Sequence, residues 1–279
     1  MKSANSNLVF NLAGGGIVVF VIGYMLLSFF TSPAVPACSE RFSSGIRLGF
    51  SDGRGNLLSP VDLEARFSGR KWGLDRNAAA ISVANQPFDN ALQVKLANAE
   101  DGDGGESRSG VSFIWRPREL AGASAACLSY AVFIPSTFKF PESGLLPGLF
   151  GATDLDELDA VKPEDSFVAR FAWQPSGDVG VDVRRPGTGG YVEGASRKMV
   201  WPTGRWVPVE QEVRLNSRGA ADGVLRTWID GRLMLDRTGM RLREIPSGGI
   251  SGVVADIGYA RTEGPAIALR VSPLVVRWQ

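Results

Sequence analysis

The stretch RWVPVEQEVRLNSRGAADGVLRTWIDGRLML, residues 205–235, predicts an antiparallel β-meander. Charged and uncharged residues alternate over Val209–Leu215, and a second alternating run covers Val224–Ile229. This period of two gives a strand one buried and one solvated face. Residues 216–223 supply Asn, Ser, Gly and Asp, which favour a turn between the two runs. Asp230-Gly231 fits a two-residue type I′ hairpin, which requires positive φ at both central positions.

The rest of the chain repeats short alternating runs separated by Gly, Pro, Asn and Asp. In Ser166–Trp173, alternation puts Phe171 and Trp173 on one face and Arg170 on the other. Further strands are expected over Val111–Arg116, Leu128–Ile134, Val179–Arg184, Ile250–Ala255 and Ile267–Trp278. The pattern predicts an all-β fold, an antiparallel two-sheet β-jelly roll (concanavalin-like sandwich) over residues 45–279.

Composition limits the chemistry that the chain can carry out. Its 279 residues include no histidine and two cysteines, and its formal net charge is +1. The lack of histidine excludes Ser-His-Asp catalysis, and two cysteines are too few for a thiolate zinc site. The near-neutral charge gives no electrostatic reason to expect nucleic acid as a partner. We expect no cofactor and no metal.

An uncharged apolar run, Leu8–Phe30, is long enough to cross a bilayer as a helix. Lys2 is the one charge before it, so the positive-inside rule places the N-terminus in the cytoplasm and the rest outside. The alternative is a signal peptide cleaved before Cys38, although the apolar part of a signal peptide usually has about 7–15 residues. The expected organisation is an anchor at 1–31, a linker at 32–44 and the β-domain at 45–279.

The two cysteines lie in different expected segments, Cys38 in the linker and Cys127 at the start of a strand. An exported location is oxidising, which favours a disulfide between them that would clamp the linker to the β-domain. Two unpaired thiols remain the alternative, because the sequence does not report the distance between them.

Four segments carry a family resemblance: VEQEVRLN at 209–216, ADGVLRTWIDGRLML at 221–235, LSYAVFIP at 128–135 and GLLPGLFG at 144–151. They resemble polysaccharide lyase family 14 and its lyase-like relatives, over roughly residues 85–255. The resemblance implies a β-jelly roll with a sugar-binding groove.

Residue by residue, the resemblance also implies that most groove residues are replaced. The family has a Gly-Lys-Leu-Pro-Gly run whose lysine is thought to act in the groove, and Leu145 stands at that lysine. On the family's next strand a serine precedes an arginine by two residues; Arg170 matches the arginine, and Val168 stands at the serine. The following strand presents two tyrosines in the family, where this chain has Asp182 and Arg184.

Lyase activity would therefore need relocated groups. Eliminative cleavage of a uronate polymer requires a group that neutralises the carboxylate, a base and an acid. Arg170, Tyr191 and Tyr259 are the candidate catalytic residues. Loss of one positioned acid–base group commonly costs about 10²–10⁴-fold, so the replacements favour a protein that is not an enzyme.

A binding surface can persist without catalysis. If the strands pair as expected, one set of faces carries an aromatic ring beside charged groups, which suits a sugar ring. The alternative is that Trp228 belongs to the inter-sheet core and that the arginines form surface ion pairs. The candidate substrate-binding residues are Arg170, Gln174, Asp182, Arg184, Arg226 and Trp228.

Three functions follow as hypotheses. The favoured one is a single-pass membrane protein, held in the inner membrane by residues 8–30, whose extracytoplasmic or periplasmic β-domain binds a polysaccharide during exopolysaccharide synthesis or export. The second is an active polysaccharide lyase with altered groove residues. The third is a structural partner of a membrane glycosyltransferase or secretion complex.

Overall fold

The computed structural model describes residues 35–67, 71–96, 109–152, 166–195, 198–244, 248–259 and 267–279. Contacts divide the chain into two units, Met1–Pro36 and Ala37–Gln279, and the fold described below is that of the second. It begins at Ala37, so the second half of the expected linker 32–44 packs as part of the β-domain. The expected span Leu8–Phe30 lies outside the described residues. Within the described ranges, no helix has the length and apolar character needed to cross a bilayer.

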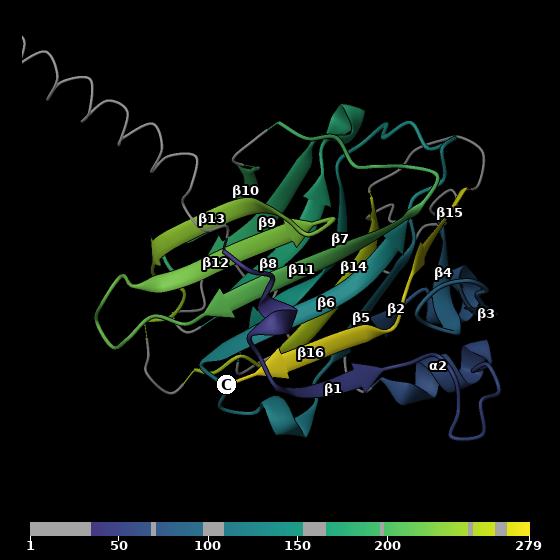
Figure 1. Cartoon of the computed structure of the whole chain (residues 1–279), viewed down its shortest axis with the longest axis horizontal. Coiled ribbons are helices and arrows are strands. Elements are labelled where there is room, and N and C mark those ends of the chain that lie inside the picture. Colours follow the sequence, from purple (N-terminus) through teal and green to yellow (C-terminus); the bar gives the residue numbers. More distant parts are fainter. Residues whose placement is uncertain are drawn as a thin grey trace, which may run out of the picture. The chain divides into compact units, whose positions relative to one another are not determined.

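The described strands form two antiparallel sheets, as the alternating pattern predicts. Figure 1 looks onto the nine-stranded sheet, with β6, β11 and β12 in front. Its strand order is β13-β12-β11-β6-β15-β4-β3, and β16 pairs with both β6 and β1. Its strands are β1 (Ser44–Leu48), β3 (Ala78–Ser82), β4 (Asn90–Leu96), β6 (Ala125–Phe133), β11 (Trp206–Arg214), β12 (Gly223–Ile229), β13 (Arg232–Met240), β15 (Ile267–Val271) and β16 (Leu274–Trp278).

The second sheet lies behind the first in Figure 1, and its order is β10-β9-β8-β7-β14-β5-β2. Its strands are β2 (Lys71–Trp72), β5 (Val111–Trp115), β7 (Gly144–Gly151), β8 (Phe167–Trp173), β9 (Val179–Arg185), β10 (Thr188–Gly194) and β14 (Gly252–Tyr259). We call it the seven-stranded sheet.

Helices in the described residues are short. They are η1 (Cys38–Glu40), α2 (Pro60–Arg66), α3 (Leu74–Asn77), η2 (Arg118–Leu120) and η4 (Pro175–Gly177). α2 begins with a capping box: the Ser59 hydroxyl accepts from Asp62 N, and the Asp62 carboxylate accepts from Ser59 N.

The predicted meander is confirmed. β11 pairs antiparallel with β12, with Val209 opposite Ile229, and β12 pairs with β13. At the hairpin, Asp230 has φ 57° and Gly231 has φ 71°, as a type I′ turn requires. β13 continues to Met240, beyond the stretch that predicted it.

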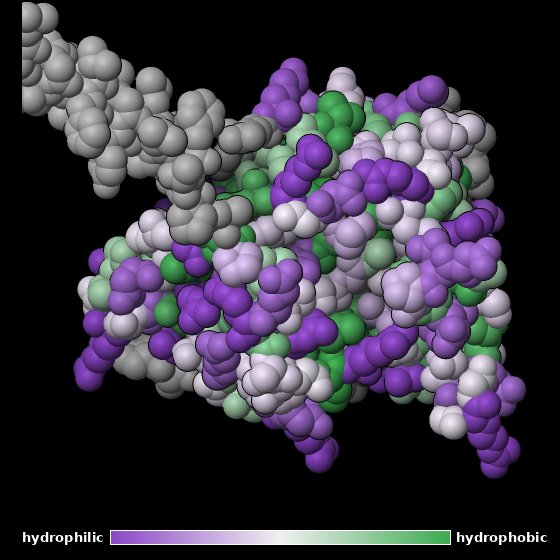
Figure 2. All heavy atoms as spheres, viewed as in Figure 1, coloured by the Kyte–Doolittle hydropathy of each residue, from purple (hydrophilic) through white to green (hydrophobic). Residues whose placement is uncertain are grey.

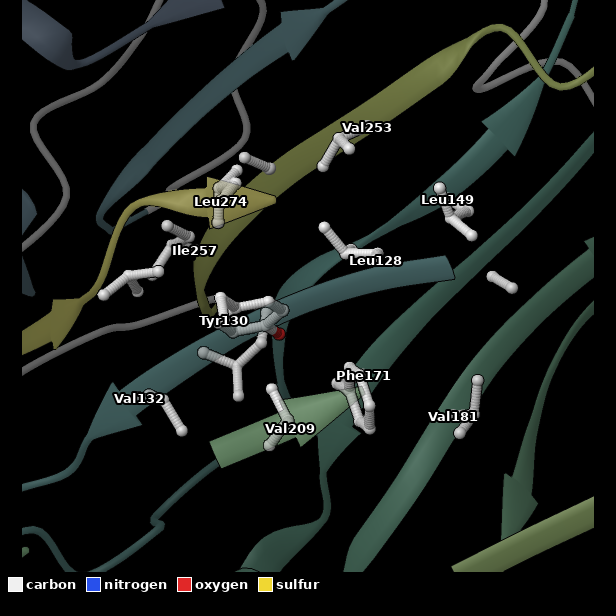
Figure 3. Packing of buried hydrophobic residues seen from close by; sticks show 14 of the residues in the cluster. Leu128, Tyr130, Val132, Leu149, Phe171, Val181, Val209, Val253, Ile257 and Leu274 are labelled. Atoms are coloured by element: carbon white, nitrogen blue, oxygen red, sulfur yellow. The ribbon is translucent and has the colours of Figure 1, made fainter. Parts of the chain in front are cut away.

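The main core lies between the two sheets. Figure 3 shows Leu128 and Tyr130 of one sheet packing toward Leu149, Phe171 and Val253 of the other. Burying such side chains contributes roughly 1.5–3 kcal/mol each, which makes this interface the main source of stability. Phe171 and Trp173 share one face of β8, as the alternation predicts, and they point inward, as do Val181 and Val183 of β9; Arg170 and Asp182 therefore point to the outer side of the seven-stranded sheet.

Candidate functional site

Arg170 lies at the centre of a polar cluster on the outer face of the seven-stranded sheet. Arg170 of β8 stands directly opposite Asp182 of β9 in the antiparallel register. Asp256 of β14 and Ser112 of β5 also stand opposite each other and belong to the same cluster. We call these four residues the Arg170 cluster.

Hydrogen bonds join all four side chains. Arg170 donates from Nε and Nη2 to Asp182 Oδ2, at 3.0 and 2.5 Å, and from Nη1 to Asp256 Oδ2. Ser112 Oγ donates to Asp256 Oδ1 at 2.5 Å. Arg184 adds a second guanidinium, whose Nε lies 3.8 Å from Asp182 Oδ2. Charge-assisted bonds of this kind are about twice as strong as neutral ones, so the cluster holds Arg170 in one orientation.

Burial and the neighbouring charges act in opposite directions on Arg170. Burial alone would lower the pKa of the Arg170 guanidinium, but the charges of Asp256 and Asp182 and their hydrogen bonds raise this pKa above its usual value. Arg170 is therefore a permanent cation, unable to take or give a proton at any working pH.

A small apolar cluster lies beside these polar groups. Ile114, Phe150, Ala152, Val168 and Val254 pack together on the outer side of the sheet, separate from the main core. Arg116 extends over them, with its Cζ 5.2 Å from the Phe150 ring centre. A cavity of about 360 Å³ adjoins this region, where η2 and the ends of β7 and β14 meet. Its lining is Arg116, Pro117, Arg118, Ala121, Gly122, Ala152, Gly248, Gly249, Ile250 and Ser251.

Leu145 lies on the same outer face, in a row of small residues that crosses the sheet. The register puts Gly258 opposite Leu145, Leu145 opposite Ala172, Ala172 opposite Gly180, and Gly180 opposite Gly194. Leu145 is half-buried and has the largest side chain in the row. The position that the family resemblance assigns to a lysine therefore faces outward, but it carries no ionisable group.

The two candidate catalytic tyrosines point toward the inter-sheet core, away from the outer face that carries Arg170. Tyr191 stands opposite Val183 and packs against the inter-sheet core. Tyr259 is buried in that core, with its ring 5.9 Å from Phe138 and 6.3 Å from Trp173. Neither ring lies on the face that carries Arg170. The third tyrosine of the described residues, Tyr130, is also in the core, and burial raises its pKa well above the ordinary value.

The expectation that the binding candidates share one set of strand faces is wrong. Gln174 directly follows β8 of the seven-stranded sheet, but Arg226 and Trp228 lie on β12 of the other sheet. They face outward there, because Leu225 and Ile229 take the inward positions of the same strand. A period of two identifies two faces, but it does not say to which sheet a strand belongs.

Trp228 is covered by the chain's own N-terminal segment. Arg41 Cζ lies 5.9 Å from the Trp228 ring centre, and Trp228 is only 1% exposed. Arg226 donates from Nε to Asp236 at 2.8 Å. Trp228 thus belongs neither to the inter-sheet core nor to an open binding face.

Residues Cys38–Phe42, which we call the N-terminal clamp, hold this covering segment in place. The predicted disulfide joins Cys38 to Cys127, with a Cα–Cα distance of 5.7 Å. Next to it, Ser39 donates from N and Oγ to the Glu210 carboxylate, at 2.9 and 2.6 Å. In Figure 1 the short helix η1 lies over the front of the sheet, and Figure 2 shows hydrophilic residues gathered around it.

A second ion cluster lies beneath the clamp, around Glu212. This fully buried carboxylate accepts from Arg41 and from Arg214 Nε (2.5 Å), and Arg226 Nη1 lies 3.7 Å away. Burial alone would raise the pKa of Glu212, but the hydrogen bonds and charges of Arg41 and Arg214 outweigh it and hold this pKa below its ordinary value. We call Glu212 and its three arginines the Glu212 cluster.

Sequence reasoning missed Asp256, Ser112 and the Glu212 cluster. Asp256 did give a signal, since it is the one charged residue in the apolar run GVVADIGY of β14. Its partner Arg170 lies 86 positions away, however, and no local pattern connects the two.

Comparisons with known proteins agree with this fold. The family model described as polysaccharide lyase 14 matches residues 84–184 and 188–259. No curated protein matches the chain. Among solved structures, the fold is similar to the alginate lyase from Aplysia kurodai, with a TM-score of 0.65 and 18% identity over 85% of this chain and 99% of that one.

Two further lyases have the same fold. The alginate lyase Aly36B has a TM-score of 0.63 and 17% identity, covering 85% of this chain and 97% of that one, and one of its variants is described in complex with alginate trisaccharide. The endo-β-1,4-glucuronan lyase from the fungus Trichoderma reesei has a TM-score of 0.54 and 12% identity, covering 85% and 96%. With the family model matching well over half of its length, the chain belongs to the polysaccharide lyase 14 family.

Proposed function

We propose that this protein binds a polysaccharide on the outer face of the seven-stranded sheet, around the Arg170 cluster, and does not cleave it by β-elimination. The observation that carries the proposal is the makeup of this face: it keeps the family's arginine but has Leu145 at the expected lysine. A leucine neither donates a proton nor binds a carboxylate.

Proton-transfer groups are scarce around the cluster. Strands β5, β7, β8, β9 and β14 contain no histidine and no lysine, and their one tyrosine, Tyr259, packs in the core. Elimination needs a base for the proton and an acid for the leaving oxygen, each within hydrogen-bond reach. The carboxylates of Asp182 and Asp256 are both held in ion pairs with Arg170.

Binding is the activity for which this face is equipped. Carboxylate oxygens and guanidinium groups make strong directional hydrogen bonds, which suit sugar hydroxyls. The complex of an Aly36B variant with alginate trisaccharide supports a sugar ligand for this fold. Arg184, at 39% side-chain exposure, is the most accessible charged group next to the cluster and is the first residue to test.

The proposal includes a location. The apolar run Leu8–Phe30 acts as an uncleaved anchor, and the β-domain lies on the extracytoplasmic side, where the polymer is an exopolysaccharide being synthesised or exported. The Cys38–Cys127 disulfide supports this side, because disulfides persist in oxidising compartments. Protease added to spheroplasts should digest the β-domain; its protection would contradict the location.

The test is calorimetric titration of the full chain, in mild detergent, with a panel of neutral and acidic polysaccharides. Arg184→Gln should weaken binding by about tenfold or more, because one charge-assisted hydrogen bond contributes roughly 1.5–3 kcal/mol. The matched control is Arg205→Gln, which removes an exposed arginine that pairs with Asp230 on the other sheet and should leave affinity unchanged. If the wild type binds no polymer, including the host's own exopolysaccharide, the proposal fails.

Family membership favours a lyase as the second candidate. Incubation with alginate and with glucuronan, followed by the ultraviolet absorbance of unsaturated uronate ends, separates the two candidates. We expect no rise in absorbance. A rise that disappears in Arg170→Gln would establish catalysis on this face and replace the binding proposal.

A further inference from the structure

The availability of Arg170 decides what kind of sugar this face can accept. A guanidinium recognises a uronate carboxylate through N–H groups that are free to donate. Arg170 already donates from Nε, Nη1 and Nη2 to two carboxylates of its own chain. Three of its five N–H groups are thus engaged, and the Arg170 side chain is so little exposed that a uronate would reach the other two only if Asp182 or Asp256 moved aside.

The exposed part of the cluster is carboxylate rather than guanidinium. The Arg170 side chain is 6% exposed, whereas those of Asp182 and Asp256 are 11% and 22% exposed. A ligand that approaches these groups therefore meets the aspartate acceptors before it meets Arg170, and the one more exposed cation beside them, Arg184, lies close to Asp182. Sugar hydroxyls donate to such acceptors, but a second carboxylate would be repelled by them.

The arginines beside the cluster do not make it attractive to a carboxylate. Arg170 and Arg184 together offset Asp182 and Asp256, which leaves the group neutral. Arg184 stays close to Asp182, with its Nε 3.8 Å from Oδ2. Arg116 donates to the carbonyl of Ala152 and lies against Phe150, beyond the apolar cluster.

From these contacts we infer that the polymer bound at the Arg170 cluster is neutral and hydroxyl-rich rather than a polyuronate. The inference rests on the proposed binding function and names the class of ligand for that same face. Asp182 and Asp256, which neutralise the charge of Arg170, are the specificity-determining residues. Their carboxylates accept hydrogen bonds from sugar hydroxyls and repel the carboxylates of a polyuronate.

The experiment compares three probes on the full chain in detergent: a neutral galactomannan, alginate and a deacetylated amino-sugar polymer. The wild type should bind galactomannan at least about tenfold more tightly than alginate, the ratio expected from one disfavoured charged contact. The double variant Asp182→Asn, Asp256→Asn keeps the side-chain shapes and releases Arg170. It should gain about tenfold in affinity for alginate and lose affinity for galactomannan.

Two controls keep the result interpretable. Asp236→Asn removes a carboxylate that pairs with Arg226 on the other sheet, and it should leave the preference of the wild type unchanged. A thermal melt of each variant shows that the fold is retained; if the double variant unfolds, Asp256→Asn alone replaces it, because Asp256 is the more exposed of the two.

The possible failures are distinct. Wild type that prefers alginate to galactomannan overturns this inference and leaves the binding proposal standing. Preference for the amino-sugar polymer also overturns it, in favour of a cationic ligand that pairs with the aspartates. Absence of binding to every polymer overturns the proposed function and the inference with it.

Discussion

On the outer face of the nine-stranded sheet one carboxylate, Glu212, gathers three arginines, whereas on the outer face of the seven-stranded sheet one guanidinium, Arg170, gathers two carboxylates. The Glu212 cluster is closed by the N-terminal clamp and its disulfide. The Arg170 cluster is built from strands of a single sheet. Similar ion chemistry therefore serves to fasten a segment of the chain on one face and, as we propose, to shape a face for a ligand on the other.

The two clusters also differ in how the partner side chains can respond when the central charge is removed. The arginines around Glu212 are long and between 19% and 37% exposed, so they can turn toward water. The aspartates around Arg170 are short, with side chains 11% and 22% exposed, so they stay close to each other. Stability measurements can test this difference independently of any ligand.

Removing the disulfide should have the largest effect. The bond joins residues 89 positions apart, and the loop-entropy relation gives about 4.5 kcal/mol of stabilisation for a loop of that length. Cys38→Ala with Cys127→Ala should lower the free energy of unfolding, measured in urea, by that order. Wild type with excess reductant is the control and should show the same loss. An unchanged urea midpoint on reduction would show that the ion pairs alone hold the clamp.

Arg170→Gln comes second. It leaves two poorly hydrated carboxylates without their cation, which costs about 3 kcal/mol when a buried ion pair is broken from one side. Urea denaturation at neutral pH measures the loss. Arg184→Gln is the matched control, since this exposed arginine should change stability little. If both variants are equally stable, the Arg170 cluster does not hold the sheet together.

Glu212→Gln should cost less, about 2 kcal/mol, in the range for one lost set of charged hydrogen bonds. Its arginine partners are long enough to turn toward solvent, whereas the short aspartates around Arg170 cannot move far apart. Glu210→Gln is the control on the same strand, because Glu210 accepts from a serine rather than from cations. A loss larger than that of Arg170→Gln would reverse the comparison between the two faces.

The Glu212 cluster also predicts a pH dependence. Burial alone would raise the pKa of Glu212, but Arg41 and Arg214 outweigh it, so this pKa is lower in the folded protein than its ordinary value of 4.5. Its stabilisation is therefore complete above pH 4.5 and is lost as the pH falls through the folded-state pKa. Glu212→Gln should show a shallower decline in melting temperature on acidification than the wild type. Parallel acid profiles would contradict this.

The exposed pair between Arg205 and Asp230 should have the smallest effect. Asp230→Asn removes the pair but keeps a residue that tolerates the φ of 57° at the hairpin, so the cost should stay below about 0.5 kcal/mol. Asp230→Ala should cost about 1 kcal/mol more, because alanine is strained in the left-handed region. Equal losses in the two variants would show that the ion pair, not the turn, is the important contribution.

Local pattern predicted the elements whose determinants lie close together in the chain. The hairpin at Asp230-Gly231 and the two faces of β8 followed from alternation and turn residues. The prediction failed for Arg226 and Trp228, which alternate in the same way but belong to the other sheet. Alternation is a property of each strand, whereas sheet membership is decided by pairing between distant strands.

By itself, the sequence determined the all-β fold, the type I′ hairpin, the pairing partners of the meander and the kinds of chemistry that a chain without histidine excludes. Only the tertiary structure decided which charges meet. It brought Asp256 of β14 to Arg170 of β8 and placed Arg41 of the clamp on Glu212 of β11. The physical reason is range: backbone preference and hydrophobic alternation act within a few residues, while an ion pair depends on where the whole sandwich places its strands.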